Sequence, residues 1–270
     1  MDKKEKLSSM EYWDNILSKA KIPFEVNLKQ YSVWLIDSFF REFIRKENYK
    51  TLLEVGAGSS AWLPYLAKEY NLTVSGIDYS EPGCKICEEN LKILGINYDE
   101  VICKDIFQWQ GGKKYDIIIS LGFIEHFNNP DEVVQIIRKH LNQRGLIITV
   151  IPNLLGIGSI ITKYFLPEVY KIHKKISIDK LKNVHEKAGL TTLKNNYAGF
   201  FYPMIIPWQV KQNGIFFTKE SSRKIVFKII ELTNALITKI LRTFKIRSGS
   251  KFFSPFIIYV GKVKENNSNN

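Results

Sequence analysis

Cysteine is scarce in this sequence, and so are features of secreted or membrane-spanning proteins. Three cysteines among 270 residues cannot build a disulfide framework. No basic and apolar segment with small residues opens the chain, so we expect no secretory signal. The longest uncharged run lies between Arg144 and Lys163, but Pro152, Gly156 and Gly158 interrupt it, which favours a buried strand and loop over a bilayer span. These shortages predict a cytoplasmic protein without a transmembrane helix.

Acidic residues are scarce in one part of the chain only. Residues 163–270 contain 20 Lys and Arg against 6 Asp and Glu, whereas residues 1–162 contain 19 against 21. The formal net charge of +12 therefore comes from the C-terminal part. Because charge predicts partners better than fold, we expect that part to meet an anionic surface and the N-terminal part to carry small-molecule chemistry.

Apolar residues, in contrast, are plentiful and follow an alternating pattern. Hydrophobic residues make up 45% of the chain, enough for a packed core. Short apolar runs predict strands at 51–55, 72–77, 97–102, 115–120, 146–151, 191–197 and 255–262. Helical spacing of apolar residues predicts helices at 10–20, 28–46, 61–70, 82–94, 131–141 and 178–188. Several strands are almost continuously hydrophobic, which is typical of a parallel sheet covered on both faces. The sequence predicts an α/β fold with a doubly wound, mostly parallel, seven-stranded sheet.

The same pattern predicts how the chain is divided. We expect residues 1–47 to form an N-terminal helical lid and residues 48–198 with 255–264 to form the α/β domain. About 57 residues separate the last two strands, far more than the usual connection of about 4 to 6, so 199–254 are predicted to be an insertion or cap. The polar residues 265–270 are predicted to be disordered.

A glycine-containing loop follows the first strand. Residues 54–60 read Glu-Val-Gly-Ala-Gly-Ser-Ser. Glycines here let the backbone turn sharply and approach a ligand at the carboxyl end of a strand, where open α/β sheets bind ligands. The spacing of Gly56, Gly58 and Ala61 also satisfies a dinucleotide fingerprint, so an NAD(P)-dependent oxidoreductase is an alternative, and a purely structural turn is another.

The next three strands also end in polar residues or glycine. Asp78 ends the second strand, where a carboxylate can accept both hydroxyl hydrogens of a ribose. Asp105 follows the third strand and Gly122 the fourth. Strand-ending aspartates often cap the following helix, which is the structural alternative for each of them. Together, four such strand ends favour a nucleoside-binding site.

These segments resemble the ordered motifs of class I S-adenosylmethionine-dependent methyltransferases, over about residues 30–200 and the last strand. The resemblance rests on Leu53–Gly58, Gly76–Ser80, Cys103–Ile106 and Leu121–Phe127. It implies a Rossmann-like fold and S-adenosylmethionine as cofactor, with the loop at the methionine part, the second strand at ribose and the third at adenine. The cofactor-binding residues that it implies are Glu54, Gly56, Ala57, Gly58, Asp78, Tyr79, Asp105, Ile106, Leu121 and Gly122. The sequence departs from many members at Ser60, where they have a third glycine.

Catalytic and acceptor-binding residues are predicted from position. His126 follows the fourth strand, and its imidazole titrates near neutrality, so it is the candidate base for a hydroxyl acceptor. The alternative is a histidine that packs or caps the next helix. Tyr12 and Trp13 on the lid, together with three aromatic residues elsewhere, are the predicted acceptor contacts; the other three are Phe123, Tyr202 and Trp208.

The remaining histidines and cysteines suggest no metal site. We expect His140, His173 and His185 at the surface, because they lie in helical or irregular basic segments. The pair Cys84 and Cys87 lacks the further ligands that zinc needs and is typical of small apolar residues on a helix. The sequence therefore predicts no metal.

The insertion contains a basic and amphipathic stretch. Residues 219–247 hold eight Lys and Arg against two Asp and Glu, with apolar residues at helical spacing from Ile225 to Phe244. This composition suits an anionic membrane surface or a lipid-linked acceptor, but also a helix packed on the domain. Nucleic acid is not favoured, because no RNA-binding module accompanies the charge.

The predicted function is O-methylation of a small-molecule, glycan, quinone or lipid-linked acceptor, at the inner face of a membrane if the basic stretch binds lipid. RNA or protein as acceptor, and S-adenosylmethionine binding without catalysis, remain alternatives. The oligomeric state is not predicted.

Overall fold

The fold is built on one seven-stranded sheet. The computed structural model describes residues 6–165, 167–200, 228, 232, 235–247 and 249–264. The strand order is β3-β2-β1-β4-β5-β7-β6, and only β7 runs antiparallel to its neighbours. The strands are β1 (Thr51–Val55), β2 (Thr73–Asp78), β3 (Tyr98–Cys103), β4 (Tyr115–Leu121), β5 (Leu141–Pro152), β6 (Leu190–Ala198) and β7 (Phe256–Val263). The predicted doubly wound, mostly parallel sheet is confirmed.

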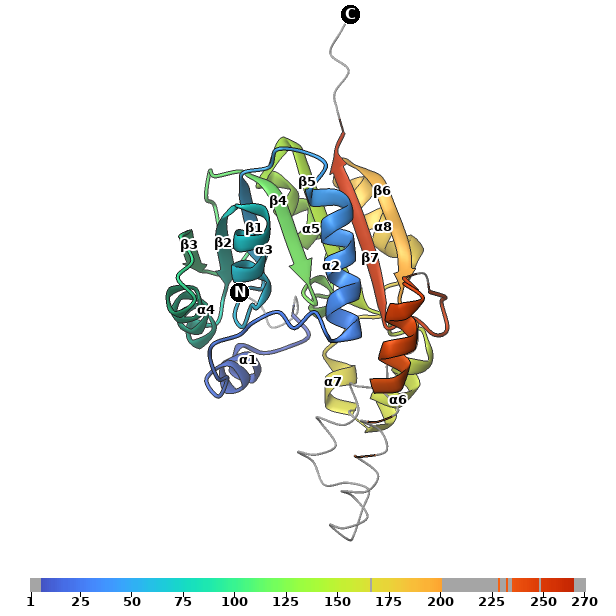
Figure 1. Cartoon of the computed structure of the whole chain (residues 1–270). Coiled ribbons are helices and arrows are strands. Elements are labelled where there is room, and N and C mark those ends of the chain that lie inside the picture. The colour runs from blue at the N-terminus through green and yellow to red at the C-terminus, as the bar shows by residue number, and fades with distance from the viewer. Residues whose placement is uncertain are drawn as a thin grey trace, which may run out of the picture.

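Helices cover both faces of this sheet (Figure 1). Side chains of α2 (Tyr31–Ile44), α3 (Trp62–Tyr70) and α4 (Glu81–Ile93) pack in one buried cluster, and those of α5 (Pro130–Lys139) and α8 (Ile178–Lys187) pack in the other. Three further elements are α1 (Met10–Leu17), α6 (Ile157–Phe165) and α7 (Pro167–Lys171). Figure 1 shows them near the end of the sheet to which the β4 arrow points. The sequence pattern missed α6 and α7.

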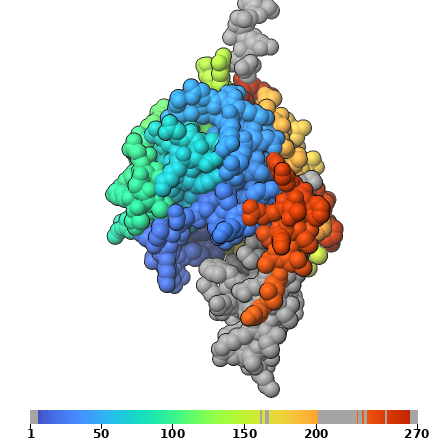
Figure 2. Space-filling view, viewed as in Figure 1, coloured from blue at the N-terminus to red at the C-terminus, as the bar shows by residue number. Residues whose placement is uncertain are grey.

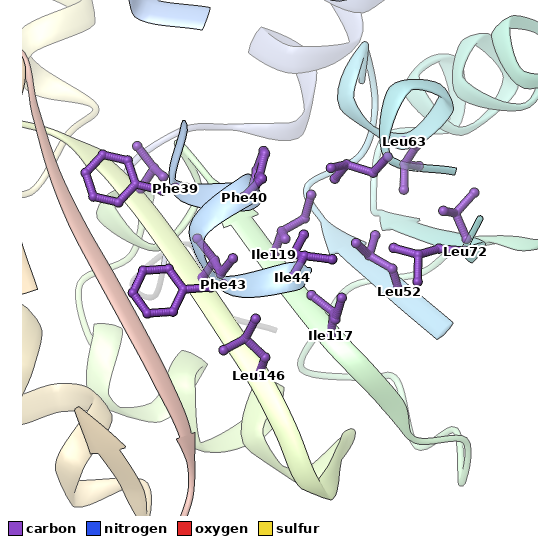
Figure 3. Packing of buried hydrophobic residues seen from close by; sticks show 14 of the residues in the cluster. Phe39, Phe40, Phe43, Ile44, Leu52, Leu63, Leu72, Ile117, Ile119 and Leu146 are labelled. Carbon is purple, nitrogen blue, oxygen red and sulfur yellow. The ribbon is translucent and has the colours of Figure 1, made fainter. Parts of the chain in front are cut away.

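Alternation along each strand divides the core between the two faces. Leu52 and Ile117 belong to one cluster, whereas their neighbours Leu53 and Ile118 belong to the other. Successive side chains of a strand point to opposite faces, so a strand buried on both sides must be apolar throughout. Figure 3 shows the first cluster, where aromatic residues of α2 such as Phe40 lie over β1, β4 and β5.

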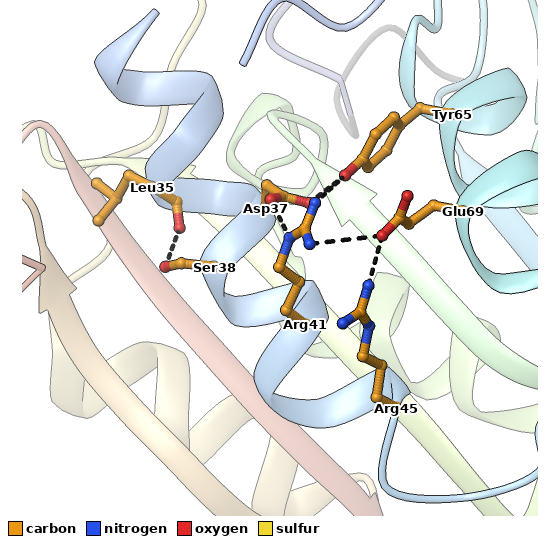
Figure 4. Close-up of polar contacts among 7 residues, drawn as sticks. All are labelled: Leu35, Asp37, Ser38, Arg41, Arg45, Tyr65 and Glu69. Atoms are coloured by element: carbon orange, nitrogen blue, oxygen red, sulfur yellow. Dashed lines mark hydrogen bonds and ion pairs between the residues drawn. The ribbon is translucent and has the colours of Figure 1, made fainter. Parts of the chain in front are cut away.

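A polar network joins α2 to α3 at the edge of this core (Figure 4). The carboxylate of Asp37 is buried and accepts hydrogen bonds from Arg41 Nε at 2.6 Å and from the Tyr65 hydroxyl at 2.6 Å. Arg41 also donates to the Tyr65 hydroxyl at 3.0 Å. Glu69 of α3 accepts from Arg45 at 2.5 Å, which adds a second link between the helices.

Replacing Asp37 with alanine should lower the free energy of unfolding by about 1 to 2 kcal/mol, because the Tyr65 hydroxyl loses its buried acceptor. Arg41 is partly exposed and keeps Glu69 within reach, which limits the loss. Urea unfolding of the two proteins measures the difference. The exposed pair of Lys171 and Glu168 is the matched control, and Glu168→Ala should change stability by less than about 0.5 kcal/mol.

The predicted N-terminal lid and C-terminal insertion correspond only in part to separate structural units. Within 1–47, only α1 and its flanking residues lie near the strand ends, while α2 is part of the core of the α/β domain. Most of 199–254 and all of 265–270 lie outside the described residues. Residues 235–243 are helical, and Leu241 is buried in the first cluster. Figure 2 shows this segment, in orange-red, against the blue N-terminal part, where the Tyr31 hydroxyl donates to the Ile246 carbonyl at 2.9 Å.

Two histidines that the sequence placed at the surface are buried instead. His140 is 5% exposed and stacks on Trp109, with 3.7 Å between ring centroids. His185 is fully buried, donates from Nδ1 to the Leu181 carbonyl at 2.8 Å and pairs through Nε2 with the Thr149 hydroxyl at 2.9 Å. Burial lowers the pKa of His185 to about 4, so it stays neutral. Helix α8 turns His185 toward the sheet. The basic composition of this segment did not predict that contact.

Candidate active site

The loop after β1 turns at a glycine that the fold requires. Gly56 has a φ of +82°, and its N–H donates to the Ile77 carbonyl at 2.9 Å. A Cβ at this position would lie 2.7 Å from a ring carbon of Phe123, closer than side chains normally approach. Glycine is thus needed for the left-handed backbone and for the close approach of Phe123, two residues after β4. The turn brings the backbone N–H groups that follow Gly56 toward the end of β2.

Ser60 stands where a third glycine was expected from the resemblance. It links the loop to the first turn of α3. Its hydroxyl donates to the buried Glu54 carboxylate and accepts from the backbone N–H groups of Trp62 and Leu63, both at 3.0 Å. Serine is a favoured residue for such capping. Burial raises the pKa of Glu54 to about 8, a rise that the Ser60 hydrogen bond opposes. Glu54 therefore fixes the loop from inside the domain.

Asp78 connects the glycine loop to the end of β2. Its Oδ2 accepts from the Gly58 N–H at 2.9 Å, and its Oδ1 accepts from the Ser80 N–H at 2.9 Å. Burial raises the pKa of this carboxyl, and the backbone N–H groups act in the opposite direction. The carboxylate lies at the wall of a pocket and is oriented by the backbone on both sides.

Two adjoining hollows lie where the strands end. The larger encloses about 80 Å³ and is lined by Lys6, Ser8, Trp13, Leu17, Gly56, Gly58, Ser59, Asp78, Tyr79, Gly122, Phe123, His126 and Phe127. The smaller shares several of these residues and adds Val55, Ile77, Lys104, Asp105 and Ile106. The structure thus brings together the loop and the ends of β1, β2 and β4 in one place, with the β3 end beside them. Gly122, at a φ of +67°, allows the chain to turn at the end of β4.

Most of the residues predicted from the sequence line these hollows, but several do not. Glu54, Ala57 and Leu121 line neither hollow: the first two are buried, and Leu121 packs against the core. Tyr12 lies behind Trp13, with its ring edge-on at 5.2 Å. Tyr202 and Trp208 lie outside the described residues.

The segment from residue 6 to α1 closes over the larger hollow. Lys6 forms an ion pair with Asp105 and lies over the Tyr79 ring, with Nζ 4.1 Å from its centroid. The Leu7 N–H donates to the His126 carbonyl at 2.8 Å. The hollow is smaller than the about 300 to 1,000 Å³ usual for ligand pockets, so we expect this segment to shift when a nucleoside cofactor binds. Sequence reasoning did not place Lys6 at this site.

His126 faces this hollow from the short helix η1 (Ile124–His126). Its Nδ1 lies 2.9 Å from the Ile172 carbonyl, and its ring is edge-on to Trp13 at 5.2 Å. Burial lowers the pKa of His126 to about 4, and the neighbouring His173 acts in the same direction. The imidazole is therefore neutral at physiological pH, which is the form that accepts a proton or binds a metal.

His173 and Glu125 complete a buried group around His126. His173 was predicted at the surface, but it is half-buried, and its ring centroid lies 4.3 Å from that of His126. Glu125 is 1% exposed, and burial raises the pKa of its carboxyl to about 8. The backbone holds the group together, because the Lys174 N–H donates to the Glu125 carbonyl at 2.6 Å. Sequence reasoning missed both residues as members of the site.

Comparison with known proteins decides between the two interpretations of the glycine loop. A family model for a methyltransferase domain matches residues 31–195, which include the ends of β1, β2, β3 and β4. The chain belongs to this methyltransferase family. This membership supports methyl transfer over the oxidoreductase alternative, and S-adenosylmethionine, the cofactor that the resemblance implied, stays a prediction. The roles of individual site residues stay predictions.

The relatives of this methyltransferase differ in their acceptors. The "Probable (S)-tetrahydroprotoberberine N-methyltransferase 2" of Papaver bracteatum is 31% identical over 81 residues, which are 30% of this chain and 23% of that protein. A SAM-dependent methyltransferase from Archaeoglobus fulgidus is 21% identical with a TM-score of 0.53, covering 85% of this chain and 93% of that one. Coclaurine N-methyltransferase, bound to N-methylheliamine and S-adenosylhomocysteine, is 13% identical with a TM-score of 0.57, covering 94% and 86%. At these identities the solved structures support the fold of the methyltransferase but not its acceptor.

Proposed function

We propose that this methyltransferase transfers the methyl group to a hydroxyl of a small-molecule, glycan, quinone or lipid-linked acceptor. The observation that carries the proposal is the position of the His126 imidazole, which lines the hollow together with Gly122. A hydroxyl must lose its proton as the methyl group arrives, whereas a neutral amine is already nucleophilic. Because Nδ1 of His126 is bonded to a carbonyl, Nε2 is the nitrogen available to the acceptor.

The walls of the hollow support an acceptor with an apolar or aromatic body. Trp13, Phe123 and Phe127 line it, and Lys6 is the cation beside them. S-adenosylmethionine carries the activated methyl group, so the residues of the chain mainly align the acceptor with the sulfur–methyl bond and exclude water. Asp78 and the glycine loop would hold the cofactor, with Asp105 and Ile106 on the adenine side once Lys6 shifts.

A labelled-methyl screen tests the proposal. Extracts are incubated with the protein and methyl-labelled S-adenosylmethionine, and are then separated into lipid, glycan, small-molecule, RNA and protein pools. We expect label in one of the first three pools, as a methyl ether that mass spectrometry places on oxygen. Label on nitrogen, or in RNA or protein, would overturn the proposed acceptor while leaving methyl transfer intact.

We further propose that the basic C-terminal part docks the protein on an anionic membrane surface. Apolar side chains recur every four residues on the exposed side of the helical segment around 235–243: Leu232, Leu236, Ile240 and Phe244. Leu236 is 61% and Phe244 72% exposed, whereas Leu241 packs inward. Exposed basic residues, Lys239 and Lys245, accompany them. Apolar insertion and attraction to anionic lipid reinforce each other at such a surface. Among the described residues no helix has the length and apolarity to cross a bilayer.

Charge reversal at Lys239 and Lys245 should weaken sedimentation with anionic liposomes by about tenfold or more, since each basic residue near the surface contributes about 1 kcal/mol. Raising the ionic strength should weaken it as well. The matched control is Lys85→Glu with Lys92→Glu, the same charge change on exposed positions of α4, at the β3 edge of the sheet (Figure 1). If the protein stays in the supernatant with anionic and neutral liposomes alike, the helix is only a packed cap.

A further inference from the structure

Three side chains that can bind a metal meet beside the proposed acceptor position. Glu125 and His126 belong to η1, and His173 follows α7, 47 positions further along than His126. One ligand atom from each of the three lies within 4.8 Å of the others. Ligand atoms of a tetrahedral divalent metal lie about 3.3 Å apart at bond lengths of about 2.0 to 2.1 Å, so small side-chain rotations would bring these into place.

Backbone carbonyls contact the Nδ1 atoms of both imidazoles. Nδ1 of His126 contacts the Ile172 carbonyl at 2.9 Å, and Nδ1 of His173 contacts the Val169 carbonyl at 2.5 Å. A carbonyl oxygen only accepts, so each Nδ1 carries the hydrogen and each Nε2 carries the lone pair. A backbone carbonyl on the second nitrogen is the typical support for a histidine that binds metal through the first.

The carboxylate of Glu125 has no partner that accounts for its burial. The side chain is 1% exposed, and among the described residues neither oxygen accepts a hydrogen bond from another side chain. Its Oε1 points toward the wall of the hollow, since a Cβ on Gly122 would lie 3.6 Å from it. A carboxyl group that is buried without a hydrogen bond costs free energy, and a metal ion would supply the missing partner.

We propose that Glu125, His126 and His173 bind one divalent transition-metal ion, such as Zn²⁺ or Mn²⁺, at the acceptor end of the active site. Two imidazoles and one carboxylate leave coordination positions open to an acceptor oxygen. This inference rests on the proposed O-methylation and refines it: His126 acts through the cation rather than by taking the proton itself.

The cation changes how the acceptor loses its proton, not the bonds that are exchanged. The acceptor oxygen binds the cation, which lowers the pKa of its hydroxyl so that the proton passes to solvent. The oxygen lone pair then forms the new bond to the methyl carbon, while the sulfur–carbon bond breaks and its electron pair returns to sulfur. The metal keeps its oxidation state throughout.

Metal binding can be measured without any acceptor. The full chain is freed of metal with a chelator and titrated with Zn²⁺ and with Mn²⁺ in a calorimeter, and Co²⁺ is added separately to record its visible spectrum. We expect one ion per chain. Glu125→Gln and His173→Ala should each weaken binding at least tenfold and lose the Co²⁺ bands, whereas His140→Ala, which removes a buried histidine outside the group, should do neither.

The outcomes separate this inference from the proposed function. His173 is only half-buried, so His173→Ala decides the matter if Glu125→Gln does not fold. Binding that is absent, or equally strong in His173→Ala, overturns the metal site. S-adenosylhomocysteine affinity is measured in parallel and should be unchanged in His173→Ala. Methyl transfer that persists in chelator-treated protein would also overturn the metal site, but it would leave the methyltransferase activity standing.

Discussion

Replacing His126 with alanine is expected to lower methyl-transfer turnover by about 100-fold or more. The change removes the one imidazole that lines the larger hollow among the described residues, and with it the group that handles the proton of the acceptor. S-adenosylhomocysteine affinity should stay within about twofold, because no cofactor-binding contact is predicted for this side chain. Steady-state kinetics with the acceptor found in the screen, and calorimetry with S-adenosylhomocysteine, measure the two effects.

The matched control for this prediction is His140→Ala. His140 is also a buried imidazole, but it stacks on Trp109 away from the hollow. Its loss should affect stability rather than turnover of the folded protein. Full activity of His126→Ala would assign His126 a packing role between Trp13 and His173.

Asp78→Ala is expected to weaken S-adenosylhomocysteine binding by about 10- to 100-fold, equivalent to about 1.4 to 2.7 kcal/mol. The change removes the predicted acceptor for the ribose hydroxyls. It also releases the Gly58 N–H, which Asp78 holds at 2.9 Å, so the glycine loop loses its orientation. Both losses act in the same direction on affinity, and isothermal titration reports their sum.

Two further variants give this measurement its controls. Asp78→Asn keeps an oxygen that can accept from Gly58 and should lose less affinity than Asp78→Ala. Asp99→Ala removes a carboxylate that pairs with Lys113 near the start of β3, and it should leave affinity unchanged. If Asp78→Ala binds S-adenosylhomocysteine as the unmodified protein does, the ribose site lies elsewhere.

The sequence predicted the sheet, and the strand ends that line the hollows, because both depend on local patterns. Apolar runs such as 115–120 are long enough to identify buried strands, and an Asp or Gly directly after such a run lies at the strand end by geometry. The two helices before the first strand were predicted from the same local spacing, whereas the lid proposed for 1–47 stays a prediction. These features need no knowledge of which distant residues touch.

What the sequence could not show depends on contacts between distant segments. His173 stands in a basic stretch that reads as surface, and only the return of the chain after α7 brings it to His126. Lys6 is 99 positions from Asp105, its partner. Glu125 belongs to the motif Leu121–Phe127, but its lack of hydrogen-bond partners depends on how the interior is packed. Local periodicity contains no information on any of these.

The place of β7 between β5 and β6 also has a consequence for folding during synthesis. β6 ends at Ala198 and β7 begins at Phe256, so about 57 residues must be made before the strand between β5 and β6 appears. At about 5 to 20 residues per second, the ribosome takes roughly 3 to 11 s over that stretch. During this time the facing edges of β5 and β6 lack their hydrogen-bonding partner, and such edges invite aggregation. The nascent chain is thus most exposed to misassembly, and to chaperone binding, in the seconds before its last strand is inserted.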